Sequence, residues 1–65
     1  MNGREIALKV NELINNGQAR TIREALDIIG GITGESAGAL YQRMWRDGYT
    51  RSRGMAVKTE QETAA

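Results

Sequence analysis

The chain has 65 residues and a formal net charge of +1, and 40% of its residues are hydrophobic. This length allows one small domain, and the composition is that of a folded protein rather than a disordered one. Cysteine and histidine are both absent, which excludes disulfides, Cys/His zinc sites, thiol nucleophiles and the usual imidazole base. We therefore expect no enzyme activity, no metal, no cofactor and no small-molecule substrate.

The charge is unevenly distributed along the chain. Between Arg43 and Lys58, five basic residues stand against Asp47 alone, which fits an anionic partner or a solvated basic face equally well. No apolar run approaches the roughly 18 residues that cross a bilayer, and the N-terminus lacks the layout of a secretory signal. We therefore expect a cytoplasmic protein, in the bacterial cytosol, without a membrane partner.

The first predicted helix covers about residues 3–15. Asn2 and Glu5 have the spacing of a capping box at its start, and residues 15–17 tolerate the left-handed backbone that ends helices. One apolar stripe at helical spacing is formed by Ile6, Val10, Leu13 and Ile14.

The second predicted helix covers about residues 22–29. Thr21 and Glu24 match a capping box, and Gly30 with Gly31 is expected to end the helix after about two turns. Its apolar face consists of Ile22, Ala25, Leu26 and Ile29. Ile32, alone among glycines, is expected to plug the core from the turn.

The third predicted helix covers about residues 34–46, with Thr33 or Ser36 as its cap and Gly48 beyond its end. We expect Trp45 in the core. Tyr41 either closes the core or donates its hydroxyl to a phosphate. The wide apolar face consists of Ala37, Leu40, Tyr41, Met44 and Trp45.

No run alternates with period two over more than a few residues, so no strand is predicted. From Gly54 onward the sequence has only weak apolar residues and no turn chemistry. The expected fold class is therefore all-α, with a compact three-helix domain over residues 1–53 and a flexible tail or linker over residues 54–65.

The second and third predicted helices resemble, over residues 21–46, the helix-turn-helix of small bacterial, phage and plasmid repressors. In that family, the first helix has a small or apolar residue facing its partner, a glycine lies at the turn, an apolar residue follows it, and two apolar residues lie inside the second helix. The matching residues here are, in order, Ala25 or Leu26, Gly30, Ile32, Ala37 and Leu40. The turn has one residue more than the family pattern, Gly31. The resemblance implies sequence-specific binding of double-stranded DNA with the third helix in the major groove. It also implies a transcriptional repressor or a plasmid or phage maintenance regulator, weakly of the plasmid-stability or partition type.

The outward residues of a helix in the major groove meet base edges. Gly34 and Gly38 leave the first turns of the third helix bare, and Gln42 and Arg43 have side chains that pair with adenine and guanine. If the face only met solvent, Gly38 would lower helix stability by about 0.5–1 kcal/mol relative to alanine, with no functional gain. The candidate base-contacting residues are Thr33, Ser36, Ala39, Gln42 and Arg43.

Arginines at and beyond the end of the third helix are placed to meet phosphates or to enter an adjacent minor groove. Hydroxyls near helix starts can hold phosphate oxygens as well. The candidate phosphate or minor-groove residues are Arg20, Thr21, Tyr41, Arg46, Arg51 and Arg53. Arg23, beside Glu24 and Asp27, is expected on a solvated face.

A DNA-binding module of this size buries only about 600–1,000 Å². The expected partner is therefore duplex DNA with repeated or palindromic half-sites, on which the protein self-associates. The alternative is a small helical protein–protein interaction module, such as an inhibitor, adaptor or antitoxin-like protein. Its docking surface would consist of Tyr41, Met44, Trp45 and Met55.

Overall fold

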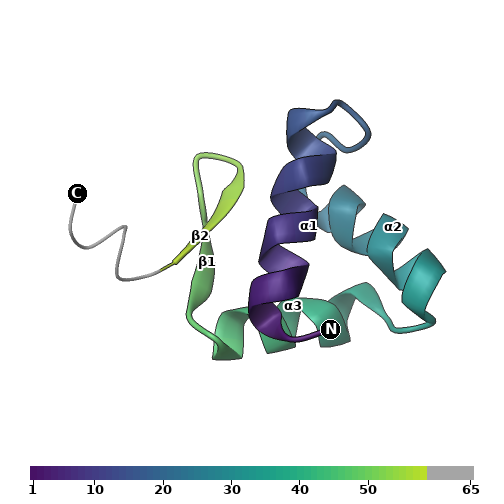
Figure 1. Ribbon diagram of the computed structural model, residues 1–65, viewed down its shortest axis with the longest axis vertical. Coiled ribbons are helices and arrows are strands. Elements are labelled where there is room, and N and C mark those ends of the chain that lie inside the picture. The colour runs from purple at the N-terminus through teal and green to yellow at the C-terminus, as the bar shows by residue number, and fades with distance from the viewer. Residues whose placement is uncertain (59–65) are drawn as a thin grey trace.

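The computed structural model describes residues 1–58. Helices α1 (Gly3–Asn15), α2 (Ile22–Thr33) and α3 (Ala37–Arg46) precede an antiparallel hairpin of β1 (Tyr49–Ser52) and β2 (Met55–Lys58). Figure 1 shows α2 and the hairpin on opposite sides of α1, with α3 running across the N-terminal end of α1. The three predicted helices are confirmed, whereas the all-α class is wrong because a small sheet is present.

The start of α1 has the predicted capping box. The Asn2 side chain accepts a hydrogen bond from the Glu5 amide (2.8 Å), and the Glu5 carboxylate accepts one from the Asn2 amide (2.9 Å). Past the end of α1, Gly17 has a φ of 81°, in the left-handed region that suits glycine. Both predicted boundaries of this helix are confirmed.

The core lies where the three helices meet. Its largest fully buried side chains are Ile6, Val10, Leu26, Ile29, Leu40 and Met44. All of them belong to the stripes that the sequence predicts, and truncating any one to alanine is expected to cost about 2–5 kcal/mol. No polar or charged side chain of residues 1–58 is buried.

The helix α2 continues about one turn past its predicted end. A Cβ atom at Gly30 would collide with the carbonyl oxygen of Glu35, so this glycine serves a close approach of the following turn rather than a helix stop. The helix ends at Gly34, whose φ is 82° and whose amide donates to the Gly30 carbonyl (2.8 Å). Ile32 lies on the outer side of the added turn and is 74% exposed, so the predicted core plug is wrong.

The helix α3 begins at Ala37, later than predicted, because Ser36 caps it by accepting a hydrogen bond from the Ala39 amide (3.1 Å). Gly34 and Glu35 therefore belong to the turn. Trp45 is 63% exposed, so its predicted core position is wrong. The reason is helical geometry, since Trp45 lies about 100° around the helix from the buried Met44.

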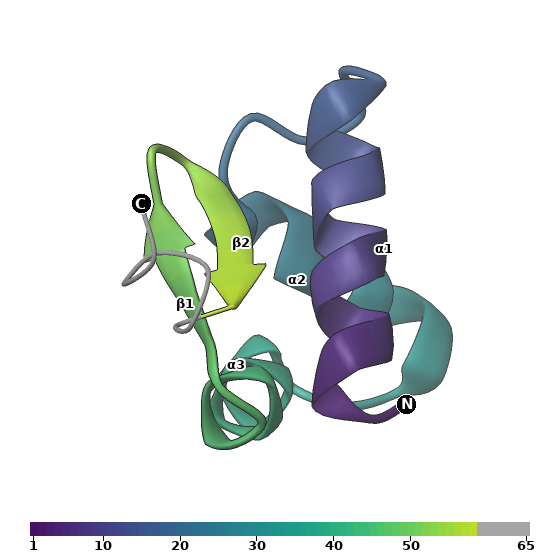
Figure 2. The same ribbon diagram turned by 60° about the vertical axis from the view of Figure 1, so that its left-hand side comes forward.

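The hairpin occupies residues expected in the tail. Tyr49 pairs with Lys58 and Ser52 with Met55, and Figure 2 shows β2 facing α1. The predicted tail is therefore wrong for residues 54–58, and its remainder, residues 59–65, lies outside the described residues.

Two long-range polar contacts fix the arrangement. Asn11 of α1 holds the backbone of Ala56 in β2, and the Asp47 carboxylate accepts a hydrogen bond from the Gly3 amide (2.7 Å). A Cβ atom at Gly3 would lie 2.5 Å from the Asp47 Cβ, so only glycine allows this contact. In the part of the chain that the structure describes, none of the helices combines the length and apolar character needed to cross a membrane.

Candidate nucleic-acid interface

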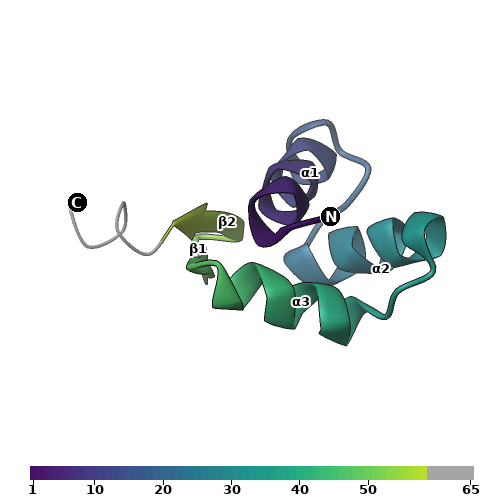
Figure 3. The same ribbon diagram turned by 60° about the horizontal axis from the view of Figure 1, so that its bottom comes forward.

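One side of α3 is left open to solvent, and Figure 3 shows this helix along the lower edge of the molecule with α1 above it. This surface, the α3 face, consists of Gly38, Ala39, Tyr41, Gln42, Trp45 and Arg46. Open space surrounds the position of a Cβ atom at Gly38. The first turn of the face is therefore bare, and the backbone there can approach another molecule closely.

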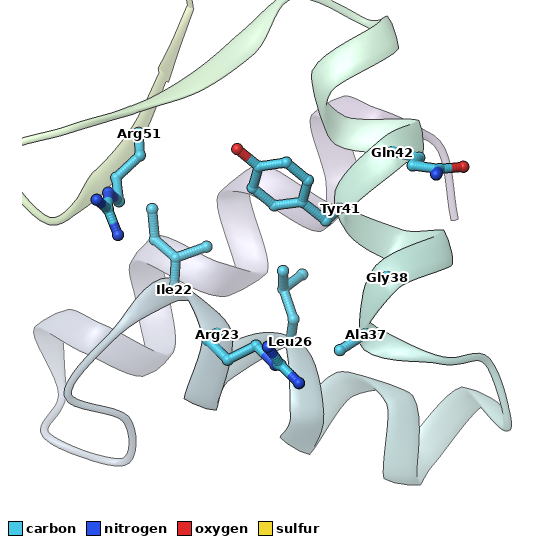
Figure 4. Close-up of a pocket in the computed structure, with 8 residues that line it drawn as sticks. All are labelled: Ile22, Arg23, Leu26, Ala37, Gly38, Tyr41, Gln42 and Arg51. Carbon is cyan, nitrogen blue, oxygen red and sulfur yellow. The ribbon is translucent and has the colours of Figure 1, made fainter.

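An open depression of about 610 Å³ adjoins the α3 face, between α2, α3 and β1. Ile22, Leu26 and Ala37 supply apolar lining. In Figure 4 the Tyr41 ring projects from α3 toward the side where Arg51 reaches in from β1, and Arg23 approaches from α2. Two cations from different elements, α2 and β1, thus lie on the depression side of the α3 face.

Most basic side chains near this surface have no acidic partner. Among residues 1–58, the exposed arginines outside every ion pair include Arg20, Arg46, Arg51 and Arg53. Arg23 lies 3.9 Å from Asp27 in an exposed pair, which contributes little. These guanidinium groups are free to bind phosphate oxygens, the chemistry for which arginine is best suited.

Arg43 differs from the other arginines because its guanidinium is already bound. Its Nη2 and Nη1 atoms lie 2.6 and 3.0 Å from the two carboxylate oxygens of Glu35, and Nη1 also donates to the Met1 carbonyl (3.0 Å). This bidentate hydrogen bonding lowers the pKa of Glu35 and raises that of Arg43. The pair links the turn before α3 to its middle and to the N-terminus.

The predicted hydroxyl contacts lie at element ends. The Thr21 and Ser36 hydroxyls accept hydrogen bonds from the amides of Glu24 and Ala39, and the Thr33 hydroxyl accepts one from the Glu35 amide (3.3 Å). A hydroxyl that accepts in this way keeps its own proton to donate. All three remain exposed, so contacts with a phosphate or a base are compatible with their structural role.

Arg53 lies in the hairpin turn. It is the one non-glycine residue among residues 1–58 with a positive φ, 54°, and Gly54 beside it has a φ of 78°. Two successive left-handed residues form the turn that Asn-Gly sequences prefer, and an arginine there costs about 1–2 kcal/mol. The hairpin turn thus carries an arginine at a position whose left-handed backbone is unfavourable for that residue.

The structure brings together some predicted residues and adds others. Gln42 and Tyr41 share the α3 face, Arg51 joins them at the depression, and Arg43 is turned into its ion pair. Arg23 lies on a solvated face beside Asp27, as the sequence predicts, and the structure in addition places it at the edge of the depression.

No protein-family model, curated protein or solved structure matches the chain significantly. Among residues 1–58, no group of three or more acidic side chains is placed to hold a metal ion.

Proposed function

We propose that the protein is a sequence-specific double-stranded DNA-binding module of the helix-turn-helix type. The motif consists of α2, the turn at residues 34–36 and α3, with α3 in the major groove. The observation that carries this proposal is the bare start of the α3 face, with Arg23 on α2 and Arg51 on β1 lining the depression beside it. A major groove admits one helix, and cations beside that helix can bind the phosphates that border the groove.

The start of α2 supports the same docking geometry. Thr21 caps α2 beside the exposed Arg20, and the first amides of a helix attract phosphate oxygens. Ile22 and Arg23, which follow the cap, line the depression next to α3. A phosphate held at this end of α2 would orient the N-terminal half of α3 toward base edges.

The hairpin extends the basic surface. Arg51 and Arg53 neutralise phosphates or enter the adjacent minor groove, and Arg46 supplies a further phosphate contact at the end of α3. The unfavourable backbone of Arg53 supports this role, because strained residues cluster where function requires them.

Duplex binding is tested with the intrinsic emission of Trp45, the sole tryptophan of the chain. Titration with a random duplex of about 21 base pairs, two helical turns, is expected to change this emission at low salt. Each phosphate contact adds about 0.9 to the slope of log K against log salt. The double variant R51A/R53A should therefore flatten the slope by up to about 1.8. The control is R4A, which removes an arginine of α1 outside the depression, and absence of binding at low salt contradicts the proposal.

The biological role within this class is transcriptional repression or plasmid or phage maintenance, exercised in the bacterial cytosol. A gel shift against the DNA upstream of its own coding region tests it. Two copies are expected on half-sites about one helical turn apart. Sedimentation should show a monomer without DNA and two copies per duplex with it, whereas a tight dimer of the free protein contradicts this assembly.

One observation favours a second candidate, the helical protein–protein interaction module. Tyr41 and Trp45, one turn apart on α3, are 42% and 63% exposed, and aromatic pairs of this kind anchor protein interfaces. Met44, the predicted member between them, is fully buried and takes no part. This function is favoured if random duplex at low salt leaves the Trp45 emission unchanged.

A further inference from the structure

The polar groups of the α3 face limit which base pairs it can read. Guanine is best recognised by an arginine that donates two parallel hydrogen bonds to O6 and N7. Arg43 is the arginine in the middle of α3, and both of its terminal nitrogens already donate to Glu35, with a third bond to the Met1 carbonyl. Arg46 is the last residue of α3, one turn farther from the start of the helix than Gln42, where the proposed function places a phosphate contact.

Gln42 carries the one amide side chain of the α3 face. It is exposed, and no hydrogen bond or ion pair with another described residue holds it. Its amide offers one donor and one acceptor, the complement of adenine N7 and N6–H in the major groove. Figure 4 shows its side chain extending outward from α3.

The other groups of the face before Arg46 are the bare backbone at Gly38, the methyl group of Ala39 and the rings of Tyr41 and Trp45. The major-groove edge of a G·C pair presents polar groups, whereas an A·T pair also presents the apolar C5-methyl group of thymine. Apolar groups pressed against G·C edges would leave donors and acceptors without partners, which is costly.

We infer that α3 reads adenine and thymine: Gln42 hydrogen-bonds an adenine, and the apolar groups of the α3 face contact thymine methyl groups. The inference rests on the proposed function and specifies its substrate as duplex DNA with consecutive A·T pairs, read from the major groove. The Glu35–Arg43 ion pair contributes to this preference, because it occupies the guanidinium that would otherwise bind guanine.

Four duplexes of equal length separate the possible origins of such a preference. The first has A·T pairs in mixed order, and the second has G·C pairs. In the third, inosine replaces guanine in the G·C duplex. An inosine–cytosine pair has the same major-groove groups as G·C but the minor-groove pattern of A·T. In the fourth, deoxyuridine replaces thymidine in the A·T duplex, which removes only the methyl groups. Binding of the full chain is measured by Trp45 emission at one fixed salt concentration.

We expect the A·T duplex to bind about tenfold or more tightly than the G·C duplex, with the inosine duplex as weak as G·C and the deoxyuridine duplex in between. The variant Q42A should reduce the ratio of A·T to G·C affinity about tenfold. Q18A removes an exposed glutamine side chain from the loop before α2 and should leave the ratio unchanged.

The outcomes separate this inference from the proposed function. If all duplexes bind equally, or if the inosine duplex binds as tightly as A·T, reading of A·T in the major groove is overturned while DNA binding stands. An unchanged ratio in Q42A overturns the assignment to Gln42. If none of the duplexes binds at low salt, the proposed function fails and the inference fails with it.

Discussion

The side chain of Asn11 in α1 forms two hydrogen bonds with the backbone of Ala56 in β2. Its Nδ2 donates to the Ala56 carbonyl (2.7 Å), and its Oδ1 accepts from the Ala56 amide (2.8 Å). One amide side chain thus satisfies both outward backbone groups of this residue, as a third strand would. Since a hairpin with only four residues in each strand is marginally stable alone, this contact with α1 helps to order it.

The first prediction concerns this contact. Asn11→Ala leaves the partly buried amide and carbonyl of Ala56 without their partner and is expected to cost about 1–3 kcal/mol of unfolding free energy. Urea denaturation measures the loss, and amide hydrogen exchange should show the hairpin opening while the helices stay protected. Asn15→Ala, at the exposed end of α1, is the matched control. Unchanged exchange in the hairpin would show that other contacts hold it.

The second prediction separates the charge of Arg53 from its backbone conformation. Arg53→Asn places a residue that tolerates a positive φ in the turn and is expected to stabilise the fold by up to about 1 kcal/mol. The same variant should flatten the salt dependence of DNA binding by about 0.9. Arg53→Lys keeps both the charge and the unfavourable backbone, so neither quantity should change. Thermal unfolding and titrations at several salt concentrations measure the two effects.

Local patterns predicted the helices well and their contacts poorly. The capping box of α1 and the buried stripes were readable because each depends on residues within a few positions of one another. The hairpin was not readable, since arginine occupies the turn position where asparagine is the usual signal and since Asn11, far along the chain, supplies the stabilising contact. The prediction that Gly30 ends α2 is wrong for a similar reason. A glycine is needed there because the Glu35 carbonyl, five residues later, approaches closely.

In the candidate site too, features that depend on local spacing were predictable, whereas contacts between distant residues were not. The exposure of Gln42 follows from helical spacing, and Arg51 was recognised from local charge alone. The pairing of Arg43 with Glu35 depends on where the turn ends and α3 begins, which the sequence placed too early. The sequence therefore predicts the exposure of Gln42 and Arg51 but not the ion pair that holds Arg43.

The third prediction concerns pH. The Arg43 guanidinium, hydrogen-bonded to the Glu35 carboxylate, holds the pKa of Glu35 below its ordinary value in the folded protein. The unfolded chain therefore binds this proton more readily, so the stability from the pair is present above the ordinary pKa and is lost as the pH falls through the folded value. Glu35→Gln should make the unfolding free energy less dependent on pH in this acid range. Glu12→Gln on α1 is the control for loss of one exposed carboxylate, and identical acid profiles of wild type and Glu35→Gln would contradict the prediction.

The last prediction separates fold from function at Gly38. Nothing lies within 4 Å of a Cβ atom built there, so Gly38→Ala should fit the fold and stabilise α3 by about 0.5–1 kcal/mol through its higher helix propensity. If the backbone of α3 approaches base edges at this position, the same methyl group should weaken binding to the preferred duplex about tenfold, a loss of about 1.4 kcal/mol.

The matched control is Gly31→Ala. This glycine also lies in a helix, is exposed and has open space around a built Cβ, but it does not line the depression beside α3. Its substitution should stabilise the fold without affecting DNA binding. Thermal unfolding and Trp45 titrations of both variants give the comparison. A Gly38→Ala protein that is more stable and binds DNA as tightly as wild type would show that α3 does not approach bases through its first turn.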